Sequence, residues 1–188
     1  MKPLEFWQGE GGTQYTARNR VDWRARIPFW REVIELTGAR SVYEVGCNVG
    51  WNLSAIRRAF ADIELYGIDV NTDAIIEAWR AGFPRVRTMP YEGKFGLVFT
   101  VGVLIHQSPE ELRDFMCSAV IEKSAQWVLA VEYAANVETE IEYRGQSGLL
   151  WKRPYGELYQ DLGLKLVREW DAGPAFDQCT AWLMEIPR

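Results

Sequence analysis

The sequence lacks the features that would place the protein in a membrane or on a nucleic acid. No apolar run reaches the roughly 18 residues that a membrane-spanning helix needs. The first residues, MKPLEFWQGEGG, lack the apolar core of a signal peptide, so the cytoplasm is the expected compartment. A formal net charge of -5 argues against a nucleic-acid partner, because phosphate binding usually needs a basic face.

Cysteine is also scarce, and repeats and linkers are absent. Cys47, Cys117 and Cys179 lie in apolar contexts without a CxxC pair, which favours buried free thiols over metal ligands, and we expect no metal site. With 48% hydrophobic and 25% charged residues, the 188-residue chain is expected to form one globular domain, 1–188. Tryptophan, by contrast, is abundant. Some of the nine are expected in the core and a few in a pocket or partner surface.

From residue 40 onward, short apolar runs alternate with segments of helical periodicity. This alternation predicts parallel strands joined by helices that cover both faces of a sheet. The expected strands are 40–45, 63–69, 95–100 and 126–133, and the expected helices are 51–61, 71–82 and 108–124. Two further strands, 164–170 and 179–186, follow each other closely, which favours an antiparallel C-terminal hairpin at the sheet edge. The sequence thus predicts a three-layer α/β, Rossmann-like fold with a mostly parallel seven-stranded sheet, and these runs supply six of its strands.

Two of the expected helices carry clear start and stop signals. Asn71 is predicted as an N-cap, with Gly82 just past the end of its helix. Ser108 is predicted to cap the next helix, with Pro109 at the first helical position and Glu111 closing a capping box.

The stretch EVGCNVG lies at the carboxyl end of the first strand, the edge where open α/β sheets bind ligands. A dinucleotide fingerprint would need a glycine where Trp51 stands, and a phosphate loop would need a lysine followed by Ser or Thr. The pattern acid-x-Gly-x-small-x-Gly instead resembles motif I of class I S-adenosylmethionine-dependent methyltransferases. The resemblance implies that Gly46 and Gly50 let the loop pass against the methionine part of the cofactor, whose ammonium group Glu44 holds.

A second acid, Asp69, ends the next strand. A carboxylate there can accept hydrogen bonds from both ribose hydroxyls, as it does in NAD-binding proteins, so Asp69 predicts an adenosine ribose and only the glycine loop identifies the cofactor. The alternative is that the acids and glycines form a tight turn and a helix cap without a ligand. Met89 is a candidate to pack on the adenine, with an ordinary core position as the alternative.

The segment FGLVFTVGVLIHQSPEEL runs from the fourth strand through Thr100 and Gly102 to His106, the only histidine. The methyltransferase resemblance implies that it lines the methyl-transfer channel. A histidine with a pKa near neutrality suits a general base for an acceptor hydroxyl or amine. The alternative is that His106 only connects the loop to the helix start, since many methyltransferases work by positioning alone. Glu132 and Tyr133, at the end of the fifth strand, are predicted to face the same transfer site.

Four segments carry a narrower resemblance that covers nearly the whole chain: FWQGEGGTQYTARNR, YEVGCNVGWNL, VFTVGVLIHQSPEEL and EIEYRGQSGLLWKRPYGEL. Together they resemble the pseudaminic acid biosynthesis-associated methylase family, found beside genes for surface nonulosonate sugars. Val101 departs from it, standing where a lysine is common in the family. The methyltransferase resemblance also implies further cofactor contacts at Cys47, Asn48, Trp51, Asn52, Val70, Thr100, Val101 and Gly102.

The two outer segments are expected to complete the site around the cofactor-binding core, 40–135. Residues 1–37 are predicted to form a helical lid or cap interrupted near Pro28, with Tyr15 or Arg18 near the methionine carboxylate. A solvated cap is the alternative to a lid.

Residues 136–160 are predicted to be an acceptor-binding insert, followed by the C-terminal hairpin, 161–188. Cations beside aromatics suit an anionic acceptor with a ring, and the alternative is a surface charge run that balances Glu140 and Glu142. The predicted acceptor contacts are Arg144, Trp151, Lys152 and Arg153.

We therefore predict an S-adenosylmethionine-dependent methyltransferase that yields S-adenosylhomocysteine. Its methyl group would pass by in-line displacement to oxygen or nitrogen of a small anionic acceptor, such as a nucleotide sugar or a nonulosonate sugar acid. The expected oligomeric state is a monomer or a homodimer. The alternatives are a methyltransferase of nucleic acid or protein, and a partner protein that binds S-adenosylmethionine without catalysis.

Overall fold

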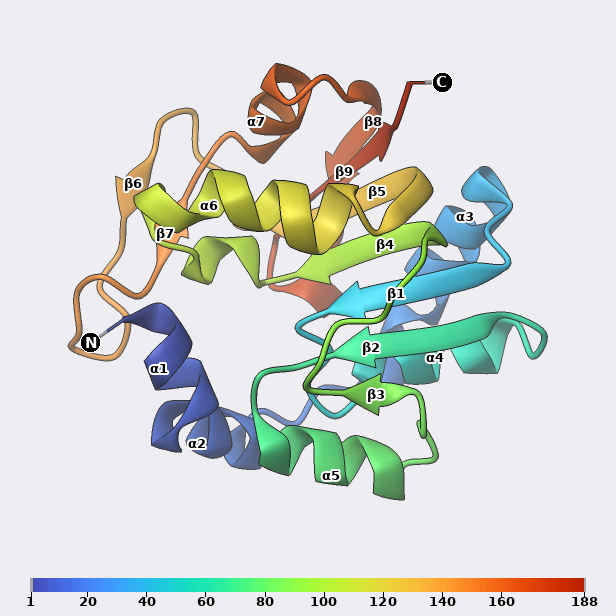
Figure 1. Ribbon diagram of the computed structural model, residues 1–188, viewed down its shortest axis with the longest axis horizontal. Helices are drawn as coiled ribbons and strands as arrows, with labels where there is room; N and C mark the ends of the chain where they lie inside the picture. Colours follow the sequence, from blue (N-terminus) through green and yellow to red (C-terminus); the bar gives the residue numbers. More distant parts are fainter. Residues whose placement is uncertain (1, 188) are drawn as a thin grey trace.

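The computed structural model describes residues 2–187 and contains one seven-stranded sheet with helices on both faces (Figure 1). Its strand order is β3-β2-β1-β4-β5-β9-β8. The strands are β1 (Ser41–Val45), β2 (Glu64–Ile68), β3 (Val86–Arg87), β4 (Phe95–Val101), β5 (Ser124–Glu132), β8 (Lys165–Asp171) and β9 (Thr180–Glu185). β1 to β5 run parallel, whereas β9 is antiparallel to both of its neighbours, which confirms the predicted hairpin. A separate small sheet pairs β6 (Thr139–Glu140) with β7 (Trp151–Lys152).

The helices divide between the two faces of the large sheet. α3 (Ile27–Thr37), α4 (Trp51–Ala59) and α5 (Thr72–Arg80) bury apolar side chains on one face. α6 (Pro109–Phe115), the π-helix η3 (Met116–Ile121) and α7 (Tyr155–Asp161) cover the other. The remaining helices are α1 (Pro3–Gln8), α2 (Glu10–Arg18) and the 3-10 turns η1 (Trp23–Arg26), η2 (Leu104–His106) and η4 (Pro174–Phe176).

Strand β4 shows why the sheet needs helices on both faces. Its side chains alternate, so Leu97 and Phe99 lie in the core under α3 while Val98 lies in the core under α6. Trp30 of α3 is fully buried, with its ring centre 4.4 Å from that of Phe99. This continuous apolar pattern, expected for a central parallel strand, is why the sheet could be predicted from sequence.

The predicted helix ends are confirmed at α5 and only in part at α6. The Asn71 side chain accepts a hydrogen bond from the Ala74 amide, and Gly82 past the helix has a φ of 88°. Ser108 is the N-cap residue of α6, but its hydroxyl donates to the Glu111 carboxylate at 3.2 Å and caps no backbone amide. The expected capping box is therefore wrong.

The break in the N-terminal region lies before Pro28. Pro28 is in the first turn of α3, where a missing amide hydrogen costs little, so the helix continues to Thr37. The chain instead leaves helical geometry after Arg18 and re-enters it at η1, which the Asp22 side chain caps. The expected interruption near Pro28 is corrected accordingly.

Within residues 2–187, two features are absent and the cysteines are unpaired. No helix is long and apolar enough to cross a membrane. No group of three or more His, Cys, Asp or Glu side chains there is arranged to hold a metal ion. Cys47, Cys117 and Cys179 are free thiols, the first and last of them buried.

Candidate active site

The glycine loop lies at the switch point of the sheet. β1 lies between β2 and β4, so the strand order reverses its direction at β1. The loop that follows β1 therefore borders the crevice in which open α/β sheets bind ligands. Gly46 and Gly50 have φ values of 74° and 85°, which side chains rarely adopt. A Cβ on Gly46 would clash with the Val103 side chain. The sequence needs glycine here so that the loop after β1 and the loop after β4 can approach closely.

Asp69, immediately after β2, ties two backbone segments together. Its Oδ2 accepts from the Asn48 amide at 2.7 Å and its Oδ1 from the Asn71 amide at 2.9 Å. Burial raises the pKa of Asp69 above its ordinary value, against the effect of these amides. The Asp69 carboxylate thus stabilises the glycine loop and the start of α5, as in the alternative in which these residues form only a tight turn and a helix cap. A carboxylate has about four lone-pair sites, so Asp69 keeps capacity for a ligand hydroxyl.

Glu44 is buried near the carboxyl end of the central strand β1, and only one of its two carboxylate oxygens has a hydrogen-bond partner within the described chain. Its Oε1 accepts from the Asn52 side chain at 2.6 Å, while its Oε2 has no partner in residues 2–187. Burial raises the pKa of Glu44 to about 8. Asn52 is held in turn by donors from Arg26 at 2.9 Å and Trp30 at 3.2 Å. Sequence reasoning missed Arg26 and Trp30 because only the tertiary fold brings the N-terminal region beneath the loop.

The helices α1 and α2 lie across the carboxyl ends of the central strands, and the arrowheads of β1 and β2 in Figure 1 point toward them. The two asparagines whose amides hold Asp69 also hold these helices. The Asn48 side chain donates to Thr16 at 2.9 Å, and that of Asn71 donates to Thr13 at 3.3 Å and to the Trp7 carbonyl at 3.4 Å. Residues 3–18, part of the lid predicted over residues 1–37, are therefore connected to the predicted cofactor loops, and this helical segment is called the lid below.

Replacing Asn71 with serine should loosen the lid without uncapping α5. Serine keeps an oxygen that can cap the helix but loses the nitrogen donor that reaches the lid. We expect amide exchange in residues 3–18 to accelerate by about 5-fold, the equivalent of one net hydrogen bond of roughly 1 kcal/mol. Hydrogen exchange measured by mass spectrometry checks this, with Asn71→Ala as the variant that loses cap and lid contact together. Unchanged exchange over residues 3–18 in both variants would contradict the connection.

His106 is held in one orientation at the end of η2. Its Nδ1 lies 2.6 Å from the Leu149 carbonyl, and its ring packs against Trp7 and Tyr143 at centre distances of 4.4 and 5.5 Å. Desolvation lowers the pKa of His106 to about 4. The expected pKa near neutrality is therefore wrong, because the lid and the insert remove the imidazole from water.

Glu132 and Tyr133 differ in what they face. The Glu132 carboxylate is fully buried and accepts from the amides of Val103, Leu104 and Ile105, so it points into the backbone of the loop that leads to His106. Burial raises its pKa to about 7. Tyr133 is half-buried, and Lys152 Nζ lies 5.4 Å from its ring centre. Tyr133 thus has the more open position of the two.

The predicted basic cluster of the insert is not assembled. Arg153 is buried, donating to Glu138 at 2.6 Å and to the Leu104 carbonyl at 3.3 Å. Arg144 is exposed in the tight turn that Tyr143 closes with Gln146, at a φ of 53°. Trp151 is buried, and the Arg153 guanidinium lies over its ring at 5.2 Å from the centre. Lys152 is the cation of the set that remains near the strand ends.

The remaining predicted residues take varied positions. Arg18 donates to the Tyr143 hydroxyl at 3.1 Å, connecting lid and insert, and the Tyr15 ring is edge-on to Trp7 at 5.4 Å. Met89 is 69% exposed, so the core alternative for it is wrong. Val70 is exposed and Trp51 half-buried, whereas Cys47 and Thr100 are buried and Val101 and Gly102 half-buried.

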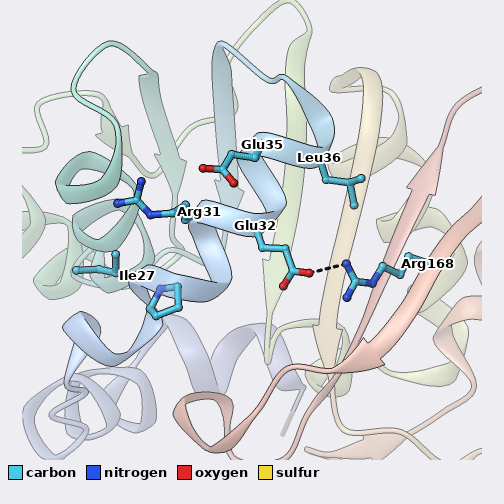
Figure 2. Close-up of a pocket in the computed structure, with 7 residues that line it drawn as sticks. Ile27, Arg31, Glu32, Glu35, Leu36 and Arg168 are labelled. Carbon is cyan, nitrogen blue, oxygen red and sulfur yellow. Dashed lines mark hydrogen bonds and ion pairs between the residues drawn. The ribbon is translucent and has the colours of Figure 1, made fainter.

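Two surface grooves lie away from this edge, around α3. The larger, of about 560 Å³, runs between α3 and β8 and is crossed by the Glu32–Arg168 ion pair of 2.6 Å (Figure 2). Charged ends of Arg31 and Glu35 surround it. Its lining includes neither Glu44 nor Asp69, so we place the candidate active site at the strand ends.

Comparison with known proteins identifies the fold. No protein-family model matches the sequence, and no curated protein matches it significantly. A magnesium protoporphyrin IX methyltransferase from Synechocystis PCC 6803 with bound SAH superposes with a TM-score of 0.72 at 15% identity, covering 98% of each chain. A sugar N-methyltransferase from Streptoalloteichus sp ATCC 53650 gives 0.70 at 13% identity, covering 96% of this chain and 94% of the other.

The protein therefore has the Rossmann-like α/β fold of S-adenosylmethionine-dependent methyltransferases. A further structure of that class, from Clostridium acetobutylicum ATCC 824, shares it with a TM-score of 0.67 at 11% identity over 94% of this chain and 98% of that one. At these identities the likeness concerns the fold, and activity is argued from the residues.

Proposed function

We propose that the protein is an S-adenosylmethionine-dependent methyltransferase that acts on a small-molecule acceptor. The observation that carries the proposal is Glu44, a buried carboxylate with one oxygen left without a partner, beside a loop at the switch point of a methyltransferase fold. An unpartnered buried carboxylate oxygen is costly, and a ligand cation would satisfy it.

The donor and acceptor groups present fit the cofactor. Glu44 Oε2 would accept from the ammonium group, and the free lone pairs of Asp69 would accept from the ribose hydroxyls. Exposed Met89, two residues after β3, is free to cover the adenine. The cofactor would supply an electrophilic methyl group, and the role of this chain is to hold the acceptor in line with it and to exclude water beneath the lid.

We propose a sugar-like acceptor, with a nucleotide sugar or a nonulosonate sugar acid as the leading class. The rings of Trp7, Tyr143 and Tyr133 offer apolar faces at the strand ends, and Lys152 offers one cation for an acidic group. The likeness to a sugar N-methyltransferase agrees with this class. Since Arg153 is paired with Glu138, the acceptor is expected to carry fewer charges than a cluster of three cations would suit.

The first test is calorimetric titration of S-adenosylmethionine into the purified protein, with NAD as the control ligand. We expect saturable binding of the first compound alone. At pH 7 binding should release about one proton, because burial keeps free Glu44 protonated and the ligand ammonium favours its ionised form. The proton is counted by repeating the titration in two buffers of different ionisation enthalpy.

The matched variant is Glu44→Gln, which keeps the shape and the Asn52 contact but has no proton to release. It should bind S-adenosylmethionine about 10-fold more weakly, the loss of one charge-assisted hydrogen bond. Failure of the folded wild-type protein to bind S-adenosylmethionine would overturn the proposed function. After binding is established, nucleotide sugars and sugar acids are screened for release of S-adenosylhomocysteine.

A further inference from the structure

Two nitrogens at the lid have complementary hydrogen-bonding character and no partner in residues 2–187. The indole Nε1 of Trp7 is a buried donor without an acceptor. The imidazole of His106 forms a hydrogen bond only through Nδ1, to the Leu149 carbonyl. Because a carbonyl accepts only, Nδ1 must carry the proton of the neutral ring, which leaves a lone pair on Nε2.

The two rings are neighbours in space although 99 residues apart in sequence. Their centres are 4.4 Å apart with an interplanar angle of 53°. Tyr15 lies edge-on to Trp7 at 5.4 Å and Tyr143 is tilted against it at 5.8 Å, so aromatic rings from the lid and from the insert surround the pair. Because the ring centres are this close, one ligand hydroxyl at the pair can be within reach of both the Trp7 donor and the His106 acceptor.

We propose that Trp7 and His106 together bind the reacting hydroxyl of the acceptor, so that the methyl group is transferred to oxygen and not to nitrogen. A hydroxyl has one proton and two lone pairs: it donates to His106 Nε2, accepts from Trp7 Nε1 and keeps one lone pair for attack. A neutral amine has a single lone pair, which the indole donor would occupy. The inference rests on the proposed function and deepens it, because it names the atom methylated and assigns Trp7 to specificity.

The reaction balances with these two residues alone. The acceptor oxygen forms a bond to the methyl carbon, the carbon–sulfur bond breaks with its electron pair left on sulfur, and the hydroxyl proton passes to His106 Nε2. The imidazolium then loses its proton to water when the lid opens. Trp7 loses no atom; it orients the oxygen and, being on α1, does so only when the lid is closed.

The first experiment determines the atom that is methylated. UDP-glucosamine and neuraminic acid each carry a free amine and several hydroxyls, and methyl-¹³C S-adenosylmethionine labels the product for assignment by NMR. Oxygen attachment is expected, and nitrogen attachment overturns the inference. If nitrogen is methylated while S-adenosylmethionine still binds in calorimetry, the proposed function stands and only this inference fails.

The second experiment measures the tautomer of His106 and needs no turnover. His106 is the only histidine, so ¹⁵N labelling of histidine gives one imidazole, whose tautomer is assigned unambiguously. A proton on Nδ1 with a bare Nε2 is expected, and the opposite tautomer overturns the inference.

The Trp7→Phe variant keeps an aromatic ring and removes the donor. We expect turnover to fall by about 10-fold, equivalent to roughly 1.4 kcal/mol, with S-adenosylmethionine affinity unchanged. Trp79→Phe in α5 is the matched control, because it also removes an indole donor, one that reaches the Val86 carbonyl at 2.7 Å and not His106. Equal turnover in Trp7→Phe and wild type would also overturn the inference.

Discussion

Replacing Glu132 with alanine should lower the free energy of unfolding by roughly 3 kcal/mol or more, which is among the largest effects expected for a single side chain at the site. The carboxylate accepts from the amides of Val103, Leu104 and Ile105, and it lies in a fully buried position. Alanine leaves these donors without a partner, and each buried unsatisfied donor costs about 1–3 kcal/mol. Urea unfolding followed by fluorescence of the tryptophans measures the loss.

Glu132→Gln is the control that separates hydrogen bonding from charge. Burial raises the folded pKa of Glu132 to about 7, above its ordinary 4.5, so the folded protein binds more protons between these values. The contribution of this group to stability is therefore complete below pH 4.5 and declines as pH rises to about 7. Glutamine does not titrate, and we expect its stability relative to wild type to increase between pH 5 and pH 8. A Gln variant as unstable as the alanine variant at every pH would contradict this account.

The same pair of variants decides how Glu132 serves the reaction. If it positions the loop, Glu132→Gln should keep the His106 imidazole signal and most of the turnover. If it acts on the substrate, Glu132→Gln should abolish turnover while the imidazole signal and the folded structure persist. The bonds to the loop amides favour positioning.

The layout of the sheet and the position of the loop could be predicted from sequence because their signals are local. The apolar residues of a strand such as β4 (95–101) follow one another directly in the sequence. Gly46 and Gly50 are required at fixed positions of a single turn because of their positive φ angles. Asn71 caps α5 through residues three positions apart. Such short-range patterns can be recognised in the sequence without knowledge of tertiary contacts.

The partners of the site residues could not be predicted, since they come from distant parts of the chain. Asn52 meets Arg26 only because α3 packs against α4. The cations of the insert appear as a cluster in sequence, yet Arg153 is turned inward to Glu138 while Arg144 remains exposed. Adjacent residues of an extended segment point to opposite sides, so closeness along the chain does not bring side chains together.

Replacing Asp69 with alanine should weaken S-adenosylmethionine binding by about 1–3 kcal/mol, or roughly 5- to 150-fold in Kd. Two losses contribute: the carboxylate no longer accepts from the ribose, and the amides of Asn48 and Asn71 lose the group that holds their loops. Calorimetric titration at pH 7.5 measures the change. Asp73→Ala is the matched control, because this exposed carboxylate lies four residues further on, in the first turn of α5, and its hydrogen bond is to the Thr13 hydroxyl, not to the loop amides.

Comparing S-adenosylmethionine with methionine separates these two losses. Methionine has no ribose, so any weakening of its binding by Asp69→Ala reports loop disorder alone. We expect the variant to lose more affinity for the full cofactor than for methionine, since only the cofactor presents hydroxyls to the lone pairs that the loop amides leave free. Equal losses for both ligands would mean that Asp69 forms the turn and the helix cap without touching the ribose, and Glu44 would then be the one buried carboxylate in contact with the cofactor.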